Sequence, residues 1–282
     1  MSAVLKQFQL DIELRHVLLH FILFFTVTSL TTLFASILIG LGICVISAPI
    51  SWQIGKKLNW KYKCTSQAAI LGATSGVSLV YSYLNYQDKF SFIFRYFFML
   101  SIFHFTEYVF TALSNRRSLQ SDSFLLNHSV SYWIAAISSW IEFGVELYFI
   151  PEMKLQLISL IGVSFCVFGD VFRKTAMFTA GNGFTHRLAT SKRVDHKLMT
   201  EGIYAYVRHP AYCGWLIWAV STQIIMCNPI CAIAYGYVTW HFFSQRIYDE
   251  ERDLFAFFGD AYSEYKERVP SGVPFVSGYD RP

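Results

Sequence analysis

The sequence predicts an all-α, polytopic integral membrane protein, and three observations support this prediction. Hydrophobic residues make up 54% of the 282 residues and charged residues only 15%, whereas soluble domains contain about 25% charged residues. The mean hydropathy is +0.38. Long apolar runs alternate with short cationic segments along the chain. This composition argues against a disordered chain, and a net charge of only +4 argues against a nucleic-acid-binding protein.

The first apolar run is too long for a single transmembrane helix. No Asp, Glu, Lys or Arg occurs from His16 to Ile50, and a membrane span needs about 20 residues. We therefore expect two short spans here, with a tight turn in the Thr-rich stretch 26–32. A further hairpin is expected at 212–243, turning at Cys227-Asn228-Pro229. The other spans, which bring the total to eight, are expected at 67–84, 90–113, 129–150 and 155–172.

The cationic residues indicate how these spans are oriented, because cytosolic loops of membrane proteins are enriched in Lys and Arg. With a cytosolic N-terminus, every cationic loop faces the cytosol, and the opposite connections are short and nearly neutral. We therefore expect both termini in the cytosol, with the glycosylation sequon Asn127-His128-Ser129 on the same side. The cations are Lys56, Lys57, Lys61, Lys63, Arg116, Arg117, Arg173, Lys174, Arg187, Lys192, Arg193, Lys197 and Arg246.

Two sets of residues lie inside the apolar runs. Arg95, His104 and Glu107 fall within the span 90–113, so one side of that helix is expected to face protein rather than lipid. Most of the six cysteines also lie in apolar runs, and no pair has CxxC spacing. This pattern predicts reduced thiols that fill space, and neither a disulfide framework nor a metal site.

The chain becomes polar and basic between Arg173 and Arg208 and then enters an aromatic segment. A basic loop attracted to anionic lipid is the simpler explanation, but the density of histidines and aromatic residues favours a binding site. Pro210 suits the first turn of a helix, whose free amides and dipole favour an anion. Gly214 permits close approach of a neighbouring backbone. Taken alone, His209 is better explained as an ordinary histidine at the membrane interface.

Ionisable residues emerge directly from the last apolar helix. Arg246 and Glu250 are four residues apart and share one helix face, which can point into a cavity. The simpler alternative is a solvated helix end with i,i+4 ion pairs. Arg173, at the exit of the sixth span, is a similar candidate, and its alternative is a charge that only sets topology.

Together these segments resemble the isoprenylcysteine carboxyl methyltransferases. The resemblance covers roughly the C-terminal third, so we divide the chain into membrane helices (1–172) and a cytosol-facing catalytic region (173–282). The Arg-His-Pro-x-Tyr-x-Gly motif and its acidic pair are also similar to phospholipid N-methyltransferases and some sterol reductases. The more specific segments are Glu201 to Gly214, the turn Cys227-Asn228-Pro229-Ile230, and Val269-Pro270-Ser271-Gly272-Val273-Pro274-Phe275.

The resemblance implies methyl esterification of the C-terminal carboxylate of a prenylated cysteine. The implied cofactor is S-adenosyl-L-methionine, with S-adenosyl-L-homocysteine as product. The implied partners are prenylated protein C-termini, such as those of small GTPases, and the lipid bilayer. The implied location is the endoplasmic reticulum membrane, with the active site facing the cytosol.

The resemblance also implies the site residues. Arg246 matches the arginine that binds the substrate carboxylate. From residue chemistry rather than from the resemblance, we expect Arg173 to assist it as a second catalytic residue. The acidic run leaves open whether Glu250 or Glu251 contacts the cofactor. The implied cofactor residues are Ala189, His196, Lys197, Leu198, Met199, Tyr204, His209, Pro210, Ala211, Tyr212 and Glu250.

Three other functions remain as alternatives. A phospholipid N-methyltransferase needs no carboxylate clamp, so the two arginines argue mildly against it. A sterol reductase needs a nicotinamide nucleotide, for which no separate motif is seen. A transporter usually places its site near the membrane midplane, whereas the ionisable residues here gather at one membrane face.

Overall fold

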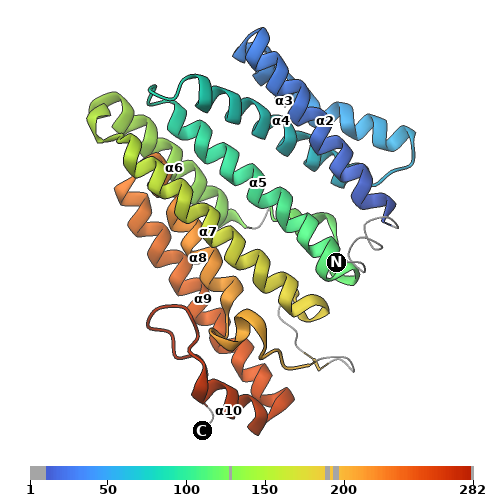
Figure 1. Cartoon of the computed structure of the whole chain (residues 1–282), viewed down its shortest axis with the longest axis vertical. Helices are drawn as coiled ribbons and strands as arrows, with labels where there is room; N and C mark the ends of the chain where they lie inside the picture. The colour runs from blue at the N-terminus through green and yellow to red at the C-terminus, as the bar shows by residue number, and fades with distance from the viewer. Residues whose placement is uncertain (1–10, 127–128, 188–190, 193–196, 281–282) are drawn as a thin grey trace.

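The computed structural model describes residues 11–126, 129–187, 191–192 and 197–280 (Figure 1). These residues form helices and connecting turns without a β-strand, which confirms the all-α prediction. The helices are α2 (Ile12–Phe34), α3 (Ile37–Lys57), α4 (Tyr62–Leu84), α5 (Ser91–Ser114), α6 (Val130–Phe149), α7 (Gln156–Ala180), α8 (Pro210–Met226), α9 (Pro229–Phe258) and α10 (Asp260–Arg268).

The membrane character of the chain is clear from these helices. Four of them, α2, α3, α5 and α7, are long and apolar enough to cross a membrane by length and composition. Large apolar side chains such as Ile134 and Ile141 on α6 are 60% exposed, as expected for helices that contact lipid. The expected total of eight spans stays a prediction.

The first apolar run does break into two helices, but the predicted position of the turn was wrong. The Thr-rich stretch 26–32 lies inside α2, where the hydroxyl of Thr28 donates to the carbonyl of Phe24 at 2.7 Å and that of Thr31 to Val27 at 3.0 Å. These bonds let threonine stay within a helix. The break comes at Ala35 and Ser36, and the Ser36 hydroxyl caps α3 by accepting from the Leu38 amide.

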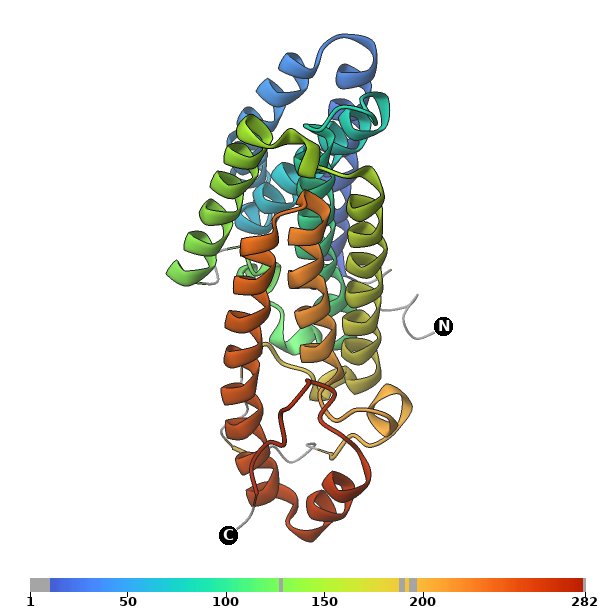
Figure 2. The same cartoon turned by 90° about the vertical axis from the view of Figure 1, so that its left-hand side faces the viewer.

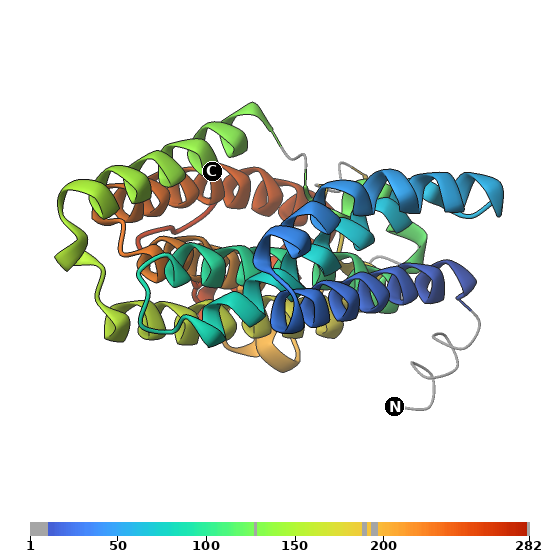
Figure 3. The same cartoon turned by 90° about the horizontal axis from the view of Figure 1, so that it is seen from above.

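The helices pack in two groups that share α5. Helix α4 packs against α2, α3 and α5, while α8 packs against α7 and α9, and α5 also contacts α7 and α8. Helix α6 lies along the outside of the bundle beside α9, as the view from above shows (Figure 3). Helix α5 is therefore central, which explains how the charged residues of this apolar helix avoid lipid.

The α7–α8 pair is packed unusually closely. A Cβ atom on Gly214 would lie 2.6 Å from the Gly169 carbonyl oxygen and 2.7 Å from the Arg173 amide nitrogen. No larger residue fits without separating the helices, so the predicted close approach at Gly214 is confirmed. Helix α7 also continues past the predicted end at residue 172, because Arg173 and Lys174 find buried partners and can remain helical.

The predicted turn at Cys227-Asn228-Pro229 is confirmed, and a buried lysine closes it. Cys227 adopts a left-handed conformation with φ of 53°, and Pro229 begins α9. The Lys154 ammonium donates to the Met226 carbonyl at 2.9 Å and pairs with Glu146 of α6 at 2.6 Å. Since free carbonyls at a helix end need donors, Lys154 joins α6, α8 and α9 at this end of the bundle.

The opposite end of the bundle carries most of the polar structure. Helix α9 extends beyond the apolar part of the molecule, and α10 and the C-terminal segment fold back against it (Figure 2). Residues 181–187 and 197–209, between α7 and α8, lie at the same end (Figure 1). Residues far apart in the sequence therefore meet there, next to the start of α8.

Candidate active site

A cavity opens where residues 180–187 and 197–199 meet the start of α8 and the end of α9. All of the predicted cofactor residues that the structure describes line this cavity. Ala189 and His196 lie outside the described residues. The predicted residues that line it are Lys197, Leu198, Met199, Tyr204, His209, Pro210, Ala211, Tyr212 and Glu250.

The C-terminal segment holds the motif at the start of α8 in place. The backbone amide of Arg208 donates to the Pro270 carbonyl at 2.9 Å, and that of His209 donates to the Ser271 carbonyl at 3.0 Å. Pro210 then occupies the first turn of α8, as predicted. The tail segment thus supports the motif from behind, and residues of that motif line the cavity.

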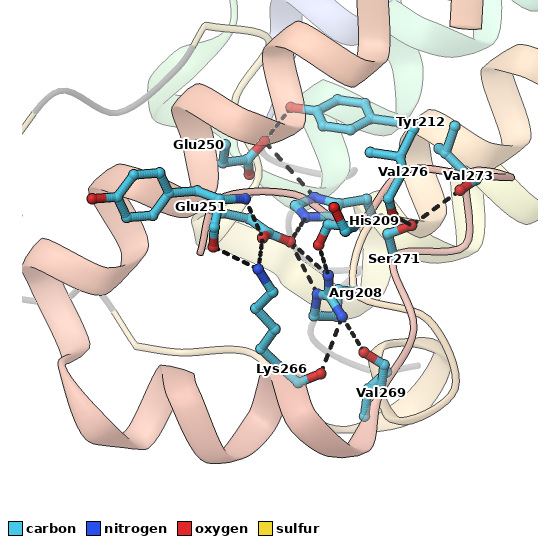
Figure 4. Close-up of polar contacts among 12 residues, drawn as sticks. Arg208, His209, Tyr212, Glu250, Glu251, Lys266, Val269, Ser271, Val273 and Val276 are labelled. Atoms are coloured by element: carbon cyan, nitrogen blue, oxygen red, sulfur yellow. Dashed lines mark hydrogen bonds and ion pairs between the residues drawn. The ribbon is translucent and has the colours of Figure 1, made fainter. Parts of the chain in front are cut away.

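Glu250 and Glu251 have different surroundings, although they are neighbours in the chain (Figure 4). The Glu251 carboxylate is fully buried and pairs with Arg208 at 3.0 Å, His209 at 3.0 Å and Lys266 at 3.3 Å. Glu250 lines the cavity, and its side chain is 33% exposed. Glu250 is therefore available to a ligand, whereas Glu251 is occupied in holding the motif, α9 and α10 together.

The surroundings of Glu251 and of Tyr265 determine the protonation states of these two side chains. Burial by itself raises the pKa of Glu251, but the hydrogen bond from His209 and the charges of His209, Arg208 and Lys266 outweigh it and hold the pKa at about 2. Burial also raises the pKa of Tyr265 to about 12. Tyr265 therefore stays protonated at neutral pH and donates to the Tyr204 carbonyl at 2.6 Å.

Tyr212 connects the cavity to Arg246. Its hydroxyl donates to the Glu250 carboxylate and accepts from Nε of Arg246 at 3.0 Å. The ring stacks between His209 and Phe243, with centroids 5.6 and 4.8 Å away. The Tyr212 hydroxyl therefore bridges Arg246 and Glu250, a carboxylate that lines the cavity.

The two predicted arginines have unlike positions. Arg246 is half-buried, and its Nη2 donates to the His186 carbonyl at 2.6 Å. Arg173 is only 2% exposed and forms a two-point pair with Glu107 of α5, at 2.6 and 2.9 Å. Neither arginine is among the residues that line the cavity, but Arg246 lies next to it.

Sequence reasoning missed several residues of the cavity wall. Asp253, Leu254 and Phe257 follow Glu250 at helical spacing on α9, so a helical projection from Glu250 could have found them. Arg208 belongs to the Arg-His-Pro motif, whose neighbouring residues were predicted, so the motif could have indicated it. The others reach the cavity through the tertiary fold. These are Ala180, Gly183, Phe184, Thr185, Arg187, Tyr262 and Tyr265.

The sequence resembles known proteins over most of its length. Residues 160–256 match the model of the isoprenylcysteine carboxyl methyltransferase family. Protein-S-isoprenylcysteine O-methyltransferase of Homo sapiens is 45% identical over 219 residues, which are 77% of this chain and 76% of the human protein. The chain belongs to the isoprenylcysteine carboxyl methyltransferase family.

Other members of the family agree with this assignment. The Dictyostelium discoideum protein of the same name is 48% identical over 63% of this chain and 75% of its own. A solved structure of the eukaryotic intramembrane Ras methyltransferase has a TM-score of 0.89 and 34% identity, covering 96% of this chain and 100% of that one. The fold shared with the family therefore extends beyond the C-terminal third from which it was first inferred.

Membership of the family decides between the alternatives. The chain is a membrane-embedded enzyme that methylates isoprenylcysteine carboxyl groups, and the phospholipid N-methyltransferase alternative is set aside. The reaction requires a methyl donor and prenylated substrates. The matched residues 160–256 include both arginines and much of the cavity wall.

Proposed function

We propose that the chain uses S-adenosyl-L-methionine to methylate the C-terminal carboxylate of prenylated proteins such as small GTPases, and releases S-adenosyl-L-homocysteine. We place the enzyme in the endoplasmic reticulum membrane with both termini in the cytosol, and assign catalysis to residues 173–282. The observation that carries this proposal is the Glu250–Tyr212–Arg246 connection, because it joins a polar cavity to a carboxylate-binding side chain.

The groups around the cavity fit S-adenosyl-L-methionine, which carries a carboxylate, a cationic end and an aromatic base. Lys197 and Arg187, with the first turn of α8, suit the carboxylate. The Glu250 carboxylate suits an ammonium group or a ribose hydroxyl. The rings of Phe184 and Phe257 provide apolar surface for the base. When bound, this cofactor supplies a methyl group activated for transfer.

Arg246 is the best placed residue to hold the substrate carboxylate. A guanidinium group presents paired N–H donors that match a carboxylate. Tyr212 and the His186 carbonyl restrain the Nε and Nη2 positions, which limits the orientation of the guanidinium plane. A prenyl chain dissolved in the bilayer would bring its polar end to this membrane face.

The chemistry demands little acid–base help from the protein. A C-terminal carboxylate is already ionised at neutral pH. The task of the chain is therefore to hold the carboxylate oxygen in line with the methyl group and to exclude water. Arg246 orients the oxygen, and Arg173 contributes by shaping the wall behind it, since it donates to the Ala211 carbonyl at 3.2 Å.

A direct assay tests the proposal. The full-length protein is purified in detergent and incubated with methyl-labelled S-adenosyl-L-methionine and either N-acetyl-farnesylcysteine or phosphatidylethanolamine. We expect labelled ester on the prenylcysteine and no labelled phospholipid. Label on the phospholipid alone, or no binding of S-adenosyl-L-homocysteine, would contradict the proposed reaction.

A further inference from the structure

Glu107 is a fully buried carboxylate toward the cavity end of the bundle, but it is not among the residues that line the cavity. It lies on α5, and its two oxygens accept from Nε and Nη2 of Arg173 at 2.6 and 2.9 Å. The Lys174 ammonium also contacts it. The imidazole Nε2 of His186 lies 2.9 Å from its second oxygen. One carboxylate thus gathers side chains from α7 and from the segment that follows it.

This arrangement is expensive for a membrane helix. Burying an ion has a large free-energy cost, and buried ion pairs are often no more stabilising than apolar residues of similar size. Stability alone therefore gives little reason for Glu107. An ionisable residue within an apolar helix is by default a candidate for function.

The contacts of Glu107 reach both predicted arginines. Arg173 is held directly, and its guanidinium also lies over the ring of Trp215 at 4.6 Å. Arg246 is reached through His186, whose side chain contacts Glu107 while its main-chain oxygen accepts from Arg246 at 2.6 Å. A substitution at Glu107 is therefore expected to displace His186, whose carbonyl accepts from Arg246.

We propose that Glu107 is a positioning residue for the methyl-transfer reaction. Its carboxylate holds Arg173 behind the cavity wall, where Arg173 donates to the carbonyl of the lining residue Ala211. It also fixes His186, so that Arg246 points toward the substrate carboxylate. The two arginines then have different tasks: Arg246 binds and Arg173 supports. The inference rests on the proposed role of Arg246.

Glu107→Gln tests this inference, because glutamine keeps the shape and removes the charge. Glu146→Gln is the matched control, since Glu146 is also a buried carboxylate paired with a lysine, Lys154, but at the other end of the bundle. We measure kcat and KM for the prenylcysteine, binding of S-adenosyl-L-homocysteine, and thermal unfolding in detergent.

We expect Glu107→Gln to lower kcat/KM by about 100-fold, as a displacement near 1 Å can do. Cofactor-product affinity should stay within about threefold of wild type, which separates misplaced chemistry from a collapsed site. Glu146→Gln should lower the unfolding temperature without a comparable loss of kcat/KM. An equal loss of activity in both variants, or none in Glu107→Gln, would overturn the inference.

His186 provides a second test, which also decides the matter if Glu107→Gln does not fold. Its side chain is at the edge of the network and 17% exposed. His186→Ala should lower kcat/KM by about 10-fold, and His186→Gln, which can still donate to Glu107, should restore most of it. If Arg246→Ala is inactive while Glu107→Gln and His186→Ala retain full activity, this inference fails alone. If Arg246→Ala is fully active, the proposed role of Arg246 fails first.

Discussion

Glu250 and Glu251 show how one residue position along a helix changes the task of a carboxylate. Successive residues point about 100° apart around a helix. Glu250 faces the cavity and accepts from Tyr212, while Glu251 faces the C-terminal segment, whose Tyr279 amide donates to it at 3.1 Å. We therefore propose that Glu250 binds the ligand and that Glu251 has a structural role.

The first prediction separates these two tasks. Glu250→Gln should weaken S-adenosyl-L-methionine binding by about 10- to 100-fold, since a hydrogen bond to a charged group contributes about 1.5–3 kcal/mol. Glu251→Gln should instead cost about 3–5 kcal/mol of stability, because it leaves Arg208 buried without its partner. Calorimetric titration and thermal unfolding measure the two effects. Reversed phenotypes would exchange the assignments.

The second prediction concerns acid stability. The pKa of Glu251 in the folded chain, about 2, lies below its ordinary value. The contribution of Glu251 to stability is therefore complete above the ordinary pKa, about 4.3, and is lost as the pH falls from there toward 2. We expect the unfolding temperature to fall over this range in wild type and to fall less in Glu251→Gln. Parallel curves for the two proteins would refute this account.

The third prediction tests Arg246. Arg246→Ala should lower kcat/KM for the prenylcysteine by roughly 100-fold or more, with binding of S-adenosyl-L-homocysteine retained, because a fixed donor aimed at reacting charge is lost. Arg252→Ala is the control, since Arg252 lies on the same helix with a side chain that is 53% exposed. Equal activity of both variants would remove Arg246 from the reaction.

At the scale of elements, the contact between α7 and α8 positions the site. Gly214 and Gly169 allow the two backbones to touch, which brings Arg173 beside the first turn of α8. The Ala211 carbonyl and the cavity wall are held by this contact. A small residue in the apolar part of the bundle thus has a consequence for the active site.

The fourth prediction follows from this packing. Gly214→Ala should destabilise the protein by about 1–3 kcal/mol, because overpacking forces the helices apart, and activity should fall as well. Gly144→Ala on α6 is the matched control, since a Cβ there meets nothing within 4 Å. It should be neutral or slightly stabilising, because alanine favours helix formation over glycine. Thermal unfolding and methylation rates compare the two, and equal stability would argue against the close contact.

At the scale of the whole molecule, the polar groups separate to the two ends of an apolar bundle. Lys154, Glu146 and Asn228 close one end, while the cavity and the Glu251 ion pairs occupy the other. Helix α5 carries Glu107 between the two groups of helices. This separation suits an enzyme whose substrates come from the bilayer and from water.

The fifth prediction tests the orientation of the whole molecule. The sequon at Asn127 lies outside the described residues, between α5 and α6, and the proposed topology places it in the cytosol. We expect no change in gel mobility on treatment with an endoglycosidase after expression in cells. As a control, a sequon inserted between α4 and α5, on the proposed lumenal side, should be glycosylated. Glycosylation of Asn127 would contradict the proposed topology and indicate the opposite orientation.

The sequence by itself determined the class of fold and part of the lining of the cavity. The apolar runs located the helices closely, because a membrane helix satisfies its own backbone hydrogen bonds and needs only length and hydrophobicity. The segments 197–199, 204 and 209–212 are each short, so their residues arrive at the cavity together. Where the signal was weakest, in the Thr-rich stretch, the local prediction was wrong.

Only the tertiary structure decided which charged groups are partners. Glu107 and Arg173 are 66 residues apart, and nothing in either local pattern shows that α5 and α7 bring them together. The same holds for Glu251, which pairs with Arg208, 43 residues away in the sequence. Glu250, by contrast, lines the cavity. The sequence around a charged residue does not identify its partner, because the pairing depends on helices that meet only after the chain has folded.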